Sequence, residues 1–146
     1  MISFAGDKSF PVPVSEVAAK LADAGWLVGT LPDVQVVAAA PERAQWKQKP
    51  KLSFVTGSLD ATMDRTAHAP GESVTFTVVT KTIGASATVR TRLVFRAADG
   101  GTRVDWTGEL IEVTGLLKMV PKGLLQATAA KVIDDVWAAV AAAMTR

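Results

Sequence analysis

The C-terminal segment from Pro121 to Met144 restricts most strongly how this chain can fold. It is rich in alanine, contains a single glycine near its start and has no proline after Pro121, and this composition favours helix. As a helix it would be roughly 35 Å long and amphipathic, so it needs an equally long apolar partner. Its apolar arc consists of Leu125, Ala129, Val132, Ile133, Val136, Trp137, Val140 and Met144.

Strands in the preceding chain can provide that partner. Apolar and polar residues alternate through 55–64, 74–78, 83–96 and 103–110, which is the pattern of strands with one dry face. The third run places Ile83 among the inward residues. Asp99-Gly-Gly is a strong hairpin signal, and Lys81-Thr82 is predicted to be another reversal. Short connections and half-polar strands favour an antiparallel sheet.

The first third of the chain predicts one strand, two short helices and two more strands. The strand covers 2–12, and Ser15 is expected to cap a short helix that Gly25 closes. A second short helical segment covers 26–31, and strands follow at 34–39 and 44–49. The predicted fold is therefore a single α+β domain over residues 1–146. It is a helix-grip fold, in which a curved antiparallel sheet of about seven strands surrounds the long C-terminal helix, with two short helices after the first strand.

Composition excludes several kinds of chemistry. The chain of 146 residues has no cysteine and one histidine, so thiolate catalysis, disulfides and paired histidine ligands are ruled out. We expect no cofactor and no metal. The formal net charge of +2 arises from 16 basic and 14 acidic residues, a balance that argues against nucleic acid as a partner. The N-terminus does not have the pattern of a signal peptide, and a cytoplasmic location is expected.

Hydrophobicity points to a cavity in addition to a core. Apolar residues make up 49% of the chain, and the mean hydropathy is +0.25. Several inward positions hold small residues, among them Ala61, Ala85, Ala87 and Gly108. Small residues opposite an alanine-bearing helix either allow close packing or leave a hollow, and both alternatives stay open at this point.

Four stretches of the chain carry a family resemblance. They are Phe4-Ala-Gly with Phe10-Pro-Val-Pro, Glu16-Val-Ala-Ala-Lys-Leu with Leu31-Pro, Val55-Thr-Gly, and Thr102-Arg-Val-Asp-Trp with Val113-Thr-Gly. In this order they resemble the SRPBCC (START and birch-pollen-allergen-like) superfamily, and within it the proteins that are similar to the G subunit of carbon monoxide dehydrogenase. The resemblance implies a cavity between sheet and helix that binds an apolar or aromatic molecule. It also implies association with molybdenum hydroxylase systems, contact with the inner membrane, and lipid- or quinone-like ligands.

The leading hypothesis is a protein that binds a lipophilic or aromatic small molecule, lipid- or quinone-like, between the sheet and the C-terminal helix. The resemblance implies, in addition, a role as an accessory protein to a molybdenum hydroxylase or carbon monoxide dehydrogenase system at the membrane. The side chains expected to line the cavity are Leu27, Leu31, Leu59, Met63, Phe76, Val78, Val89, Trp106, Leu110, Leu117, Val120, Leu124 and Trp137.

Two groups of lysines are candidates for contact with the inner-membrane surface or with a partner protein. Lys47, Lys49 and Lys51 share one face of a strand beside Trp46, although charged residues also protect an edge strand from aggregation. Lys118 and Lys122 stand in the apolar stretch 115–125. That stretch is either a mobile mouth over the cavity, with its lysines at lipid head groups, or the ordinary beginning of the helix.

The alternative hypothesis is an enzyme of the polyketide cyclase or hydrolase kind in the same cavity. It requires an acid or base on the dry face of the sheet, and the alternation places none there. His68 is expected to be exposed beside the 69–71 turn, and Asp60 and Asp64 lie on the polar side of their strand. We therefore predict no catalytic residue.

Overall fold

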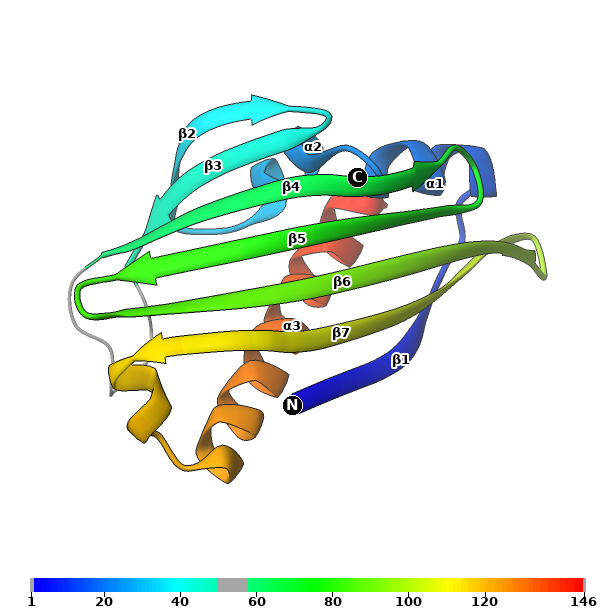
Figure 1. Cartoon of the computed structure of the whole chain (residues 1–146). Helices are drawn as coiled ribbons and strands as arrows, with labels where there is room; N and C mark the ends of the chain where they lie inside the picture. The colour runs from blue at the N-terminus through cyan, green and yellow to red at the C-terminus, as the bar shows by residue number, and fades with distance from the viewer. Residues whose placement is uncertain (1, 50–57, 146) are drawn as a thin grey trace.

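A computed structural model describes residues 2–49 and 58–145 of the chain. It confirms the predicted α+β fold, with seven antiparallel strands, two short helices after the first strand and a long C-terminal helix (Figure 1). The elements in chain order are β1 (Ile2–Phe10), α1 (Val14–Leu21), α2 (Ala24–Thr30), β2 (Val34–Ala40), β3 (Arg43–Gln48), β4 (Leu59–Ala69), β5 (Ser73–Thr82), β6 (Ala85–Ala98), β7 (Gly101–Gly115), η1 (Leu116–Met119) and α3 (Lys122–Met144).

The strands form one sheet in the order β1-β7-β6-β5-β4-β3-β2, and every neighbouring pair is antiparallel. The sheet curves around α3, and α1 and α2 lie on the same side as α3 (Figure 1). We call the side of the sheet that faces α3 the inner face. Alternating residues of each strand point to this face, and the register aligns them from strand to strand. Val78 on β5, for example, pairs with Val89 on β6, which pairs with Leu110 on β7.

Three predicted boundaries are wrong. Ser15 does not cap the first helix but lies inside it, because α1 begins at Val14 after the N-cap Pro13. The reversal expected at Lys81-Thr82 lies two residues later, because Gly84 supplies the positive φ of 78° at the turn. Ile83 is therefore not inward but 89% exposed. Gly25 does not close the first helix. It lies inside α2, where a Cβ would meet the backbone of Ala39 at 3.3 Å, so its role is close packing against β2.

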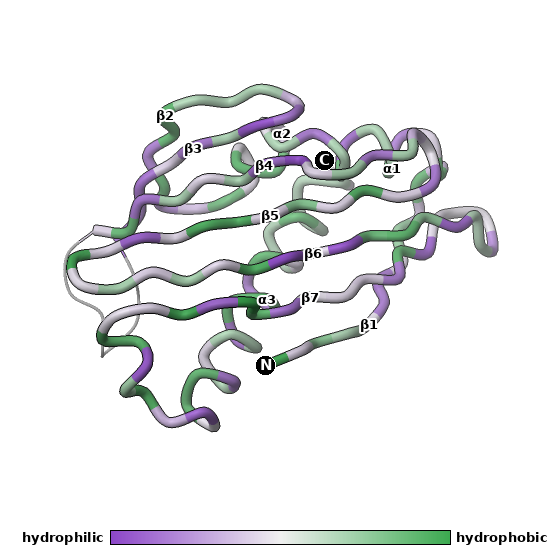
Figure 2. The backbone as a smooth tube through the Cα atoms, viewed as in Figure 1, coloured by the Kyte–Doolittle hydropathy of each residue, from purple (hydrophilic) through white to green (hydrophobic). Residues whose placement is uncertain are grey.

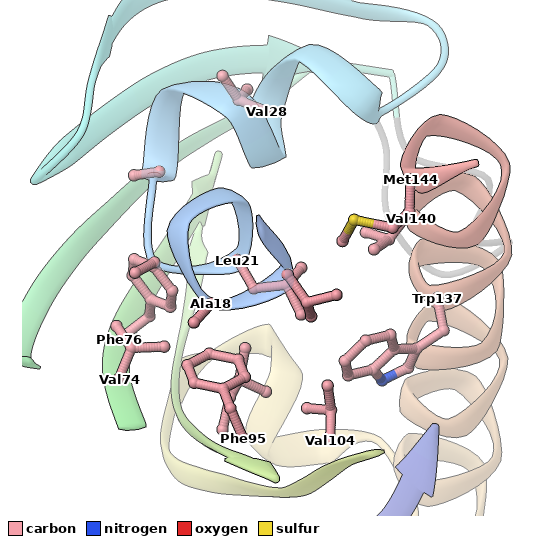
Figure 3. Packing of buried hydrophobic residues seen from close by; sticks show 14 of the residues in the cluster. Ala18, Leu21, Val28, Val74, Phe76, Phe95, Val104, Trp137, Val140 and Met144 are labelled. Carbon is pink, nitrogen blue, oxygen red and sulfur yellow. The ribbon is translucent and has the colours of Figure 1, made fainter. Parts of the chain in front are cut away.

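One end of the inner face is densely filled, and we call it the packed half. Side chains from α1, α2 and the second half of α3 meet the inner residues of β5, β6 and β7 there (Figure 3). Phe10 and Trp137 lie with ring centroids 6.4 Å apart. The fully buried side chains of this half include Leu21, Val28, Val74, Val104 and Val140.

The first half of α3 does not share in this packing. The buried residues of the helix are Trp137, Val140 and Met144, all in its second half. Val132, which the helical wheel placed on the buried arc, is 48% exposed, and Val136 is exposed as well. The first half of the helix extends beyond α1 and α2 (Figure 1), and α2 contacts α3. At 100° per residue, Val132 and Val136 also lie about 140° and 100° around the helix from the buried Trp137.

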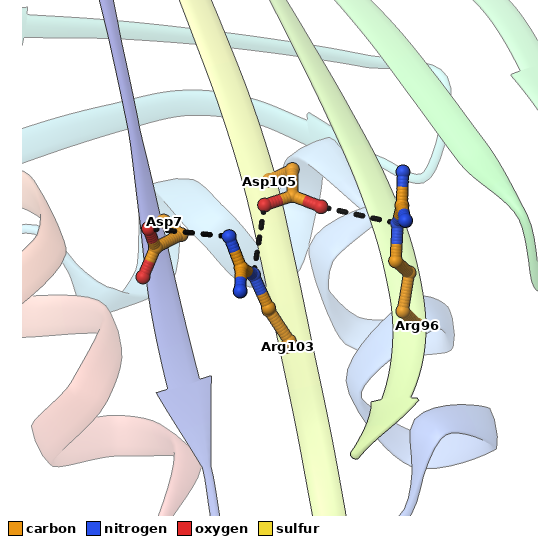
Figure 4. Close-up of polar contacts among 4 residues, drawn as sticks. All are labelled: Asp7, Arg96, Arg103 and Asp105. Atoms are coloured by element: carbon orange, nitrogen blue, oxygen red, sulfur yellow. Dashed lines mark hydrogen bonds and ion pairs between the residues drawn. The ribbon is translucent and has the colours of Figure 1, made fainter.

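Ion pairs on the outer face connect three strands. Asp105 on β7 accepts a hydrogen bond from Arg103 Nε at 3.0 Å, and it forms an ion pair with Arg96 Nε of β6 at 3.1 Å. Arg103 also reaches Asp7 of β1 at 3.5 Å (Figure 4). The hydrogen bond to Asp105 and the two negative charges raise the pKa of Arg103. Asp7, Arg96 and Arg103 are largely exposed and Asp105 is half-buried, so the network adds little stability.

Candidate functional site

The other half of the inner face holds apolar side chains that are not part of the core, and we call it the open half. On the sheet it consists of Leu59, Val89, Leu110 and Val113, all half-buried, and on α3 of Leu125, which lines one pocket with Leu110 and Val113. None of these five residues is among those of the buried cluster or those packed against it. This half is therefore an apolar surface without a partner among the described residues.

A pocket of about 270 Å³ opens within this half, between the sheet and the beginning of α3. Ile2 of β1, Leu110 and Val113 of β7, and Leu125 of α3 give it an apolar lining, whereas Glu112 and Lys122 add charge and are exposed. Its volume is near the lower end of the usual range for small-molecule sites.

A β-bulge shapes this pocket. The register between β6 and β7 shifts at Thr88 and Val89. Val89 pairs with Leu110 and Ala87 pairs with Val113, so both β7 residues face inward although they are three positions apart. An extra residue on one strand produces this kind of spacing. The bulge places two large apolar side chains at the pocket where strict alternation would place one.

The cavity side chains expected from the sequence fall into three groups. Phe76 and Trp137 are buried in the core. Leu27, Leu31, Met63, Val78 and Trp106 are half-buried and pack against the core. The remaining ones lie outside it, and these are Leu59, Val89, Leu110, Leu117, Val120 and Leu124. Leu110 alone of the thirteen lines the pocket described above.

Sequence reasoning missed four apolar residues of the pocket, which are Ile2, Ile111, Val113 and Leu125. Leu125 was assigned to the buried arc of the helix and Ile2 to the first strand, but neither was placed at a site. Val113 had a usable signal, because the apolar pair Leu110 and Val113 breaks the period of two in a way that is typical of a bulge.

A second pocket, of about 290 Å³, lies at the β2–β3 end of the sheet and has a mainly polar lining that includes Asp33, Gln35, Lys47 and Lys49. Lys47 approaches Asp60 at 4.0 Å, and Lys49 is exposed. Lys51 lies outside the described residues. This pocket is less suited to an apolar ligand than the one between β7 and α3.

An exposed apolar cluster lies beside the open half. Ile83 in the β5–β6 turn is 89% exposed, Met119 in η1 is 81% exposed, and Leu116 is exposed too. The backbone N–H of Leu116 donates to the carbonyl of Gly84 at 2.9 Å, so the two segments are held together. We call Ile83, Leu116 and Met119 the apolar tip.

Basic residues surround the apolar tip. Lys81, Lys118 and Lys122 are exposed next to it in the sequence, and Figure 2 shows hydrophobic and hydrophilic residues interspersed along η1 and the start of α3. Among the described residues, no helix has the length and apolarity needed to cross a bilayer.

The inner face does carry ionisable side chains that the alternation did not reveal. Arg65 on β4 pairs with Phe76 and so faces inward, and it donates to the carbonyl of Ala22 at 2.9 Å. Ala22 is the C-cap of α1, where a positive charge is favourable. Arg65 therefore has a structural role at the end of a helix. Lys8 on β1 pairs with Val104, so it also faces inward, and it is half-buried.

Comparison with protein families assigns the chain over nearly its full length. The family model described as CoxG, the G subunit of carbon monoxide dehydrogenase, matches residues 6–145. No sequence among the curated proteins matches the chain significantly.

Solved structures show the same fold at low sequence identity. A conserved protein from Geobacillus kaustophilus has a TM-score of 0.84 at 16% identity, over 99% of this chain and 95% of that one. A protein from Thermus thermophilus has a TM-score of 0.66 at 13% identity, over 99% and 97% of the two chains. Ara h 8.0201 has a TM-score of 0.64 at 12% identity, over 99% and 97%.

Proposed function

Because this chain belongs to the CoxG family of the SRPBCC superfamily, we propose that it binds a lipophilic or aromatic small molecule, lipid- or quinone-like, in the open half. The observation that carries the proposal is the pocket between β7 and α3, with Ile2, Leu110, Val113 and Leu125 in its lining. Apolar surface of this kind, left uncovered in a folded chain, is typical of a binding site.

Recognition would be driven mainly by the hydrophobic effect. Burial of apolar surface contributes about 25 cal/mol per Å², and a molecule in the pocket would cover side chains of both the sheet and α3. The half-buried side chains of Leu59 and Val89 lie farther along the same face. They would extend the contact for a longer ligand.

Titration with N-phenyl-1-naphthylamine, an uncharged probe that fluoresces in apolar sites, tests this proposal. Val113→Trp places a large side chain in the pocket and is expected to weaken binding tenfold or more. Val37→Trp makes the same change at an exposed position on β2 and serves as the control. Equal affinities for the two variants would contradict the proposed site. Native mass spectrometry, followed by organic extraction, would identify a molecule that co-purifies with the protein.

We further propose that the apolar tip and its lysines contact the anionic surface of the inner membrane, so that the protein is cytoplasmic and peripheral to it. Exposed apolar side chains next to lysines favour binding to such a surface. The apolar side chains enter the lipid interface, and the lysines meet the phosphate groups of the lipids. Sedimentation with phosphatidylglycerol vesicles tests it. Met119→Ser is expected to reduce binding several-fold, and Val36→Ser on β2 is expected to leave it unchanged. Identical sedimentation of both variants would exclude the tip.

The family description also supports a role as an accessory protein of a molybdenum hydroxylase or carbon monoxide dehydrogenase. A pull-down with the carbon monoxide dehydrogenase or molybdenum hydroxylase tests this association. It is done at low salt, where charge attraction is strongest. The enzyme alternative gains no support from the described residues, since both ionisable residues of the pocket, Glu112 and Lys122, are exposed to solvent.

A further inference from the structure

The methionines of this chain differ sharply in their access to solvent. Met144, at the end of α3, is 2% exposed and belongs to the core, and Met63 on β4 is half-buried and packs against the core. Met119, the last residue of η1, is 81% exposed. A dissolved oxidant must touch the sulfur of a methionine to oxidise it, so the rate follows exposure. Within residues 2–49 and 58–145, Met119 is therefore the methionine that such an oxidant reaches most readily.

The fold does not depend on the side chain of Met119. η1 contains no buried residue, and in the described part of the chain the Met119 side chain makes no hydrogen bond or ring contact. Backbone contacts hold the segment instead, with the Leu116 N–H on the carbonyl of Gly84 at 2.9 Å and the Val120 N–H on that of Leu117 at 3.2 Å. A polar atom on the Met119 sulfur would leave these contacts and the core intact.

Met119 provides a large share of the apolar surface of the tip, which has only two other members, Ile83 and Leu116. A methionine thioether is apolar and flexible, and it adapts to an irregular apolar environment. The sulfoxide is polar and accepts hydrogen bonds from water. Moving such a group into an apolar environment without a hydrogen-bond partner is unfavourable. Oxidation of Met119 would therefore oppose entry of the tip into lipid, whereas the charges of Lys118 and Lys122 would remain.

We propose that Met119 is a site of reversible oxidation that controls the contact of the apolar tip with the membrane. The oxidant is a hydroperoxide, in the simplest case hydrogen peroxide. A lone pair of the sulfur forms the new S–O bond as the O–O bond breaks. The sulfur is oxidised by two electrons, and the peroxide is reduced and leaves as one molecule of water. Methionine sulfoxide reductases restore the thioether. The inference rests on the proposed membrane contact and adds its regulation.

Membrane contact should in turn protect Met119 from oxidation. When the tip is seated in the lipid interface, the sulfur lies among apolar groups and meets dissolved peroxide less often. The protein that is free in solution is then the form that becomes oxidised. Met63 and Met144 lie outside the tip, so their oxidation should not depend on lipid.

Limited oxidation with hydrogen peroxide, followed by peptide mapping, tests the choice of residue. We expect the sulfoxide to form several-fold faster at Met119 than at Met63 or Met144. Excess phosphatidylglycerol vesicles should slow the reaction at Met119 several-fold, and phosphatidylcholine vesicles, which lack the negative charge, should slow it less. Equal rates at the three methionines would overturn the inference.

Sedimentation with phosphatidylglycerol vesicles tests the consequence. Oxidation is expected to lower the affinity of the wild-type protein about three- to tenfold, because one of three apolar side chains is lost from the contact. The control Met63→Leu should lose the same factor. Met119→Leu keeps an apolar side chain that peroxide does not oxidise, so it should sediment equally well before and after treatment. Met119→Gln has a polar side chain of similar length and should bind as weakly as the oxidised protein.

The outcomes separate this inference from the proposed membrane contact. If the untreated protein sediments with the vesicles and the oxidised protein sediments equally well, the inference is overturned and the membrane contact survives. A loss of binding that Met119→Leu does not prevent would also overturn it. If the untreated protein does not sediment at all, the membrane contact is contradicted and the inference with it. Recovery of binding after treatment with methionine sulfoxide reductases would support reversible control.

Discussion

Two residues of α3 illustrate how the two halves of the inner face differ. Val140 in the packed half is 2% exposed, whereas Leu125, at the start of the helix, is half-buried beside a pocket. Helix and sheet continue through both halves, but α1 and α2 cover one of them only (Figure 1). The apolar pattern of the chain therefore extends beyond what its core uses. An apolar surface that the fold leaves uncovered is best explained by a ligand or partner that covers it.

The largest expected contrast between the halves is between two Leu→Ala substitutions. Leu21 is fully buried in the packed half, so Leu21→Ala is expected to lower the free energy of unfolding by about 2–5 kcal/mol. Leu110 is half-buried in the open half, and Leu110→Ala should cost about 1 kcal/mol. Urea denaturation of both variants measures the difference. Equal losses would mean that the open half is packed as densely as the core.

A second contrast uses the same substitution at two places on one helix. Val140→Ala is expected to lower the free energy of unfolding by about 2 kcal/mol, because the valine side chain is buried. Val132→Ala should leave the unfolding free energy nearly unchanged, since alanine has the higher helix propensity and the valine is exposed. Thermal unfolding of the pair provides the test. A clear loss for Val132→Ala would place that residue in a packed environment.

Glycine substitutions sharpen the comparison at the boundary between the halves. Gly6→Ala would press a Cβ against the Trp106 ring and is expected to cost about 1–2 kcal/mol by overpacking. Gly108→Ala enters free space and should be neutral or slightly stabilising. Denaturant midpoints of the two variants distinguish these cases. Destabilisation by Gly108→Ala would show that the space at Gly108 is filled.

The smallest effect is expected on the outer face, which the two halves share. Asp105→Asn removes the carboxylate between Arg96 and Arg103 and should lower the free energy of unfolding by less than about 1 kcal/mol, because both arginines are exposed to solvent. The loss should shrink further in roughly 1 M salt. Urea denaturation of the variant at two salt concentrations provides the test. A large loss of unfolding free energy that does not depend on salt would contradict the view that inner-face packing determines stability.

The order and type of the elements could be predicted because strand and helix have different periods. Alternation identified the inward residues of β5, β6 and β7, and the alanine-rich segment identified α3. The family resemblance, drawn from the order of four weak stretches, is confirmed by the match over residues 6–145. Turn positions were harder to predict, as Ile83 and Gly84 illustrate.

The site was predicted only in outline. Periodicity tells which residues face inward, but it does not tell how far α1 and α2 reach, so Phe76 and Trp137 were grouped with Leu110. Phe76 and Trp137 are part of the core, whereas Leu110 lies beside a pocket. The inward direction of Arg65 depends on register and tertiary packing, which no local pattern encodes.

Methyl NMR during titration with N-phenyl-1-naphthylamine tests most directly the claim that the open half is the binding site. The account predicts that the methyl signals of Leu110, Val113 and Leu125, which line the pocket, shift with a common saturation curve. Those of Leu21, Val104 and Val140, in the packed half, should stay in place. Shifts confined to the packed half, or saturable binding that leaves the methyl signals of the open half unmoved, would contradict it.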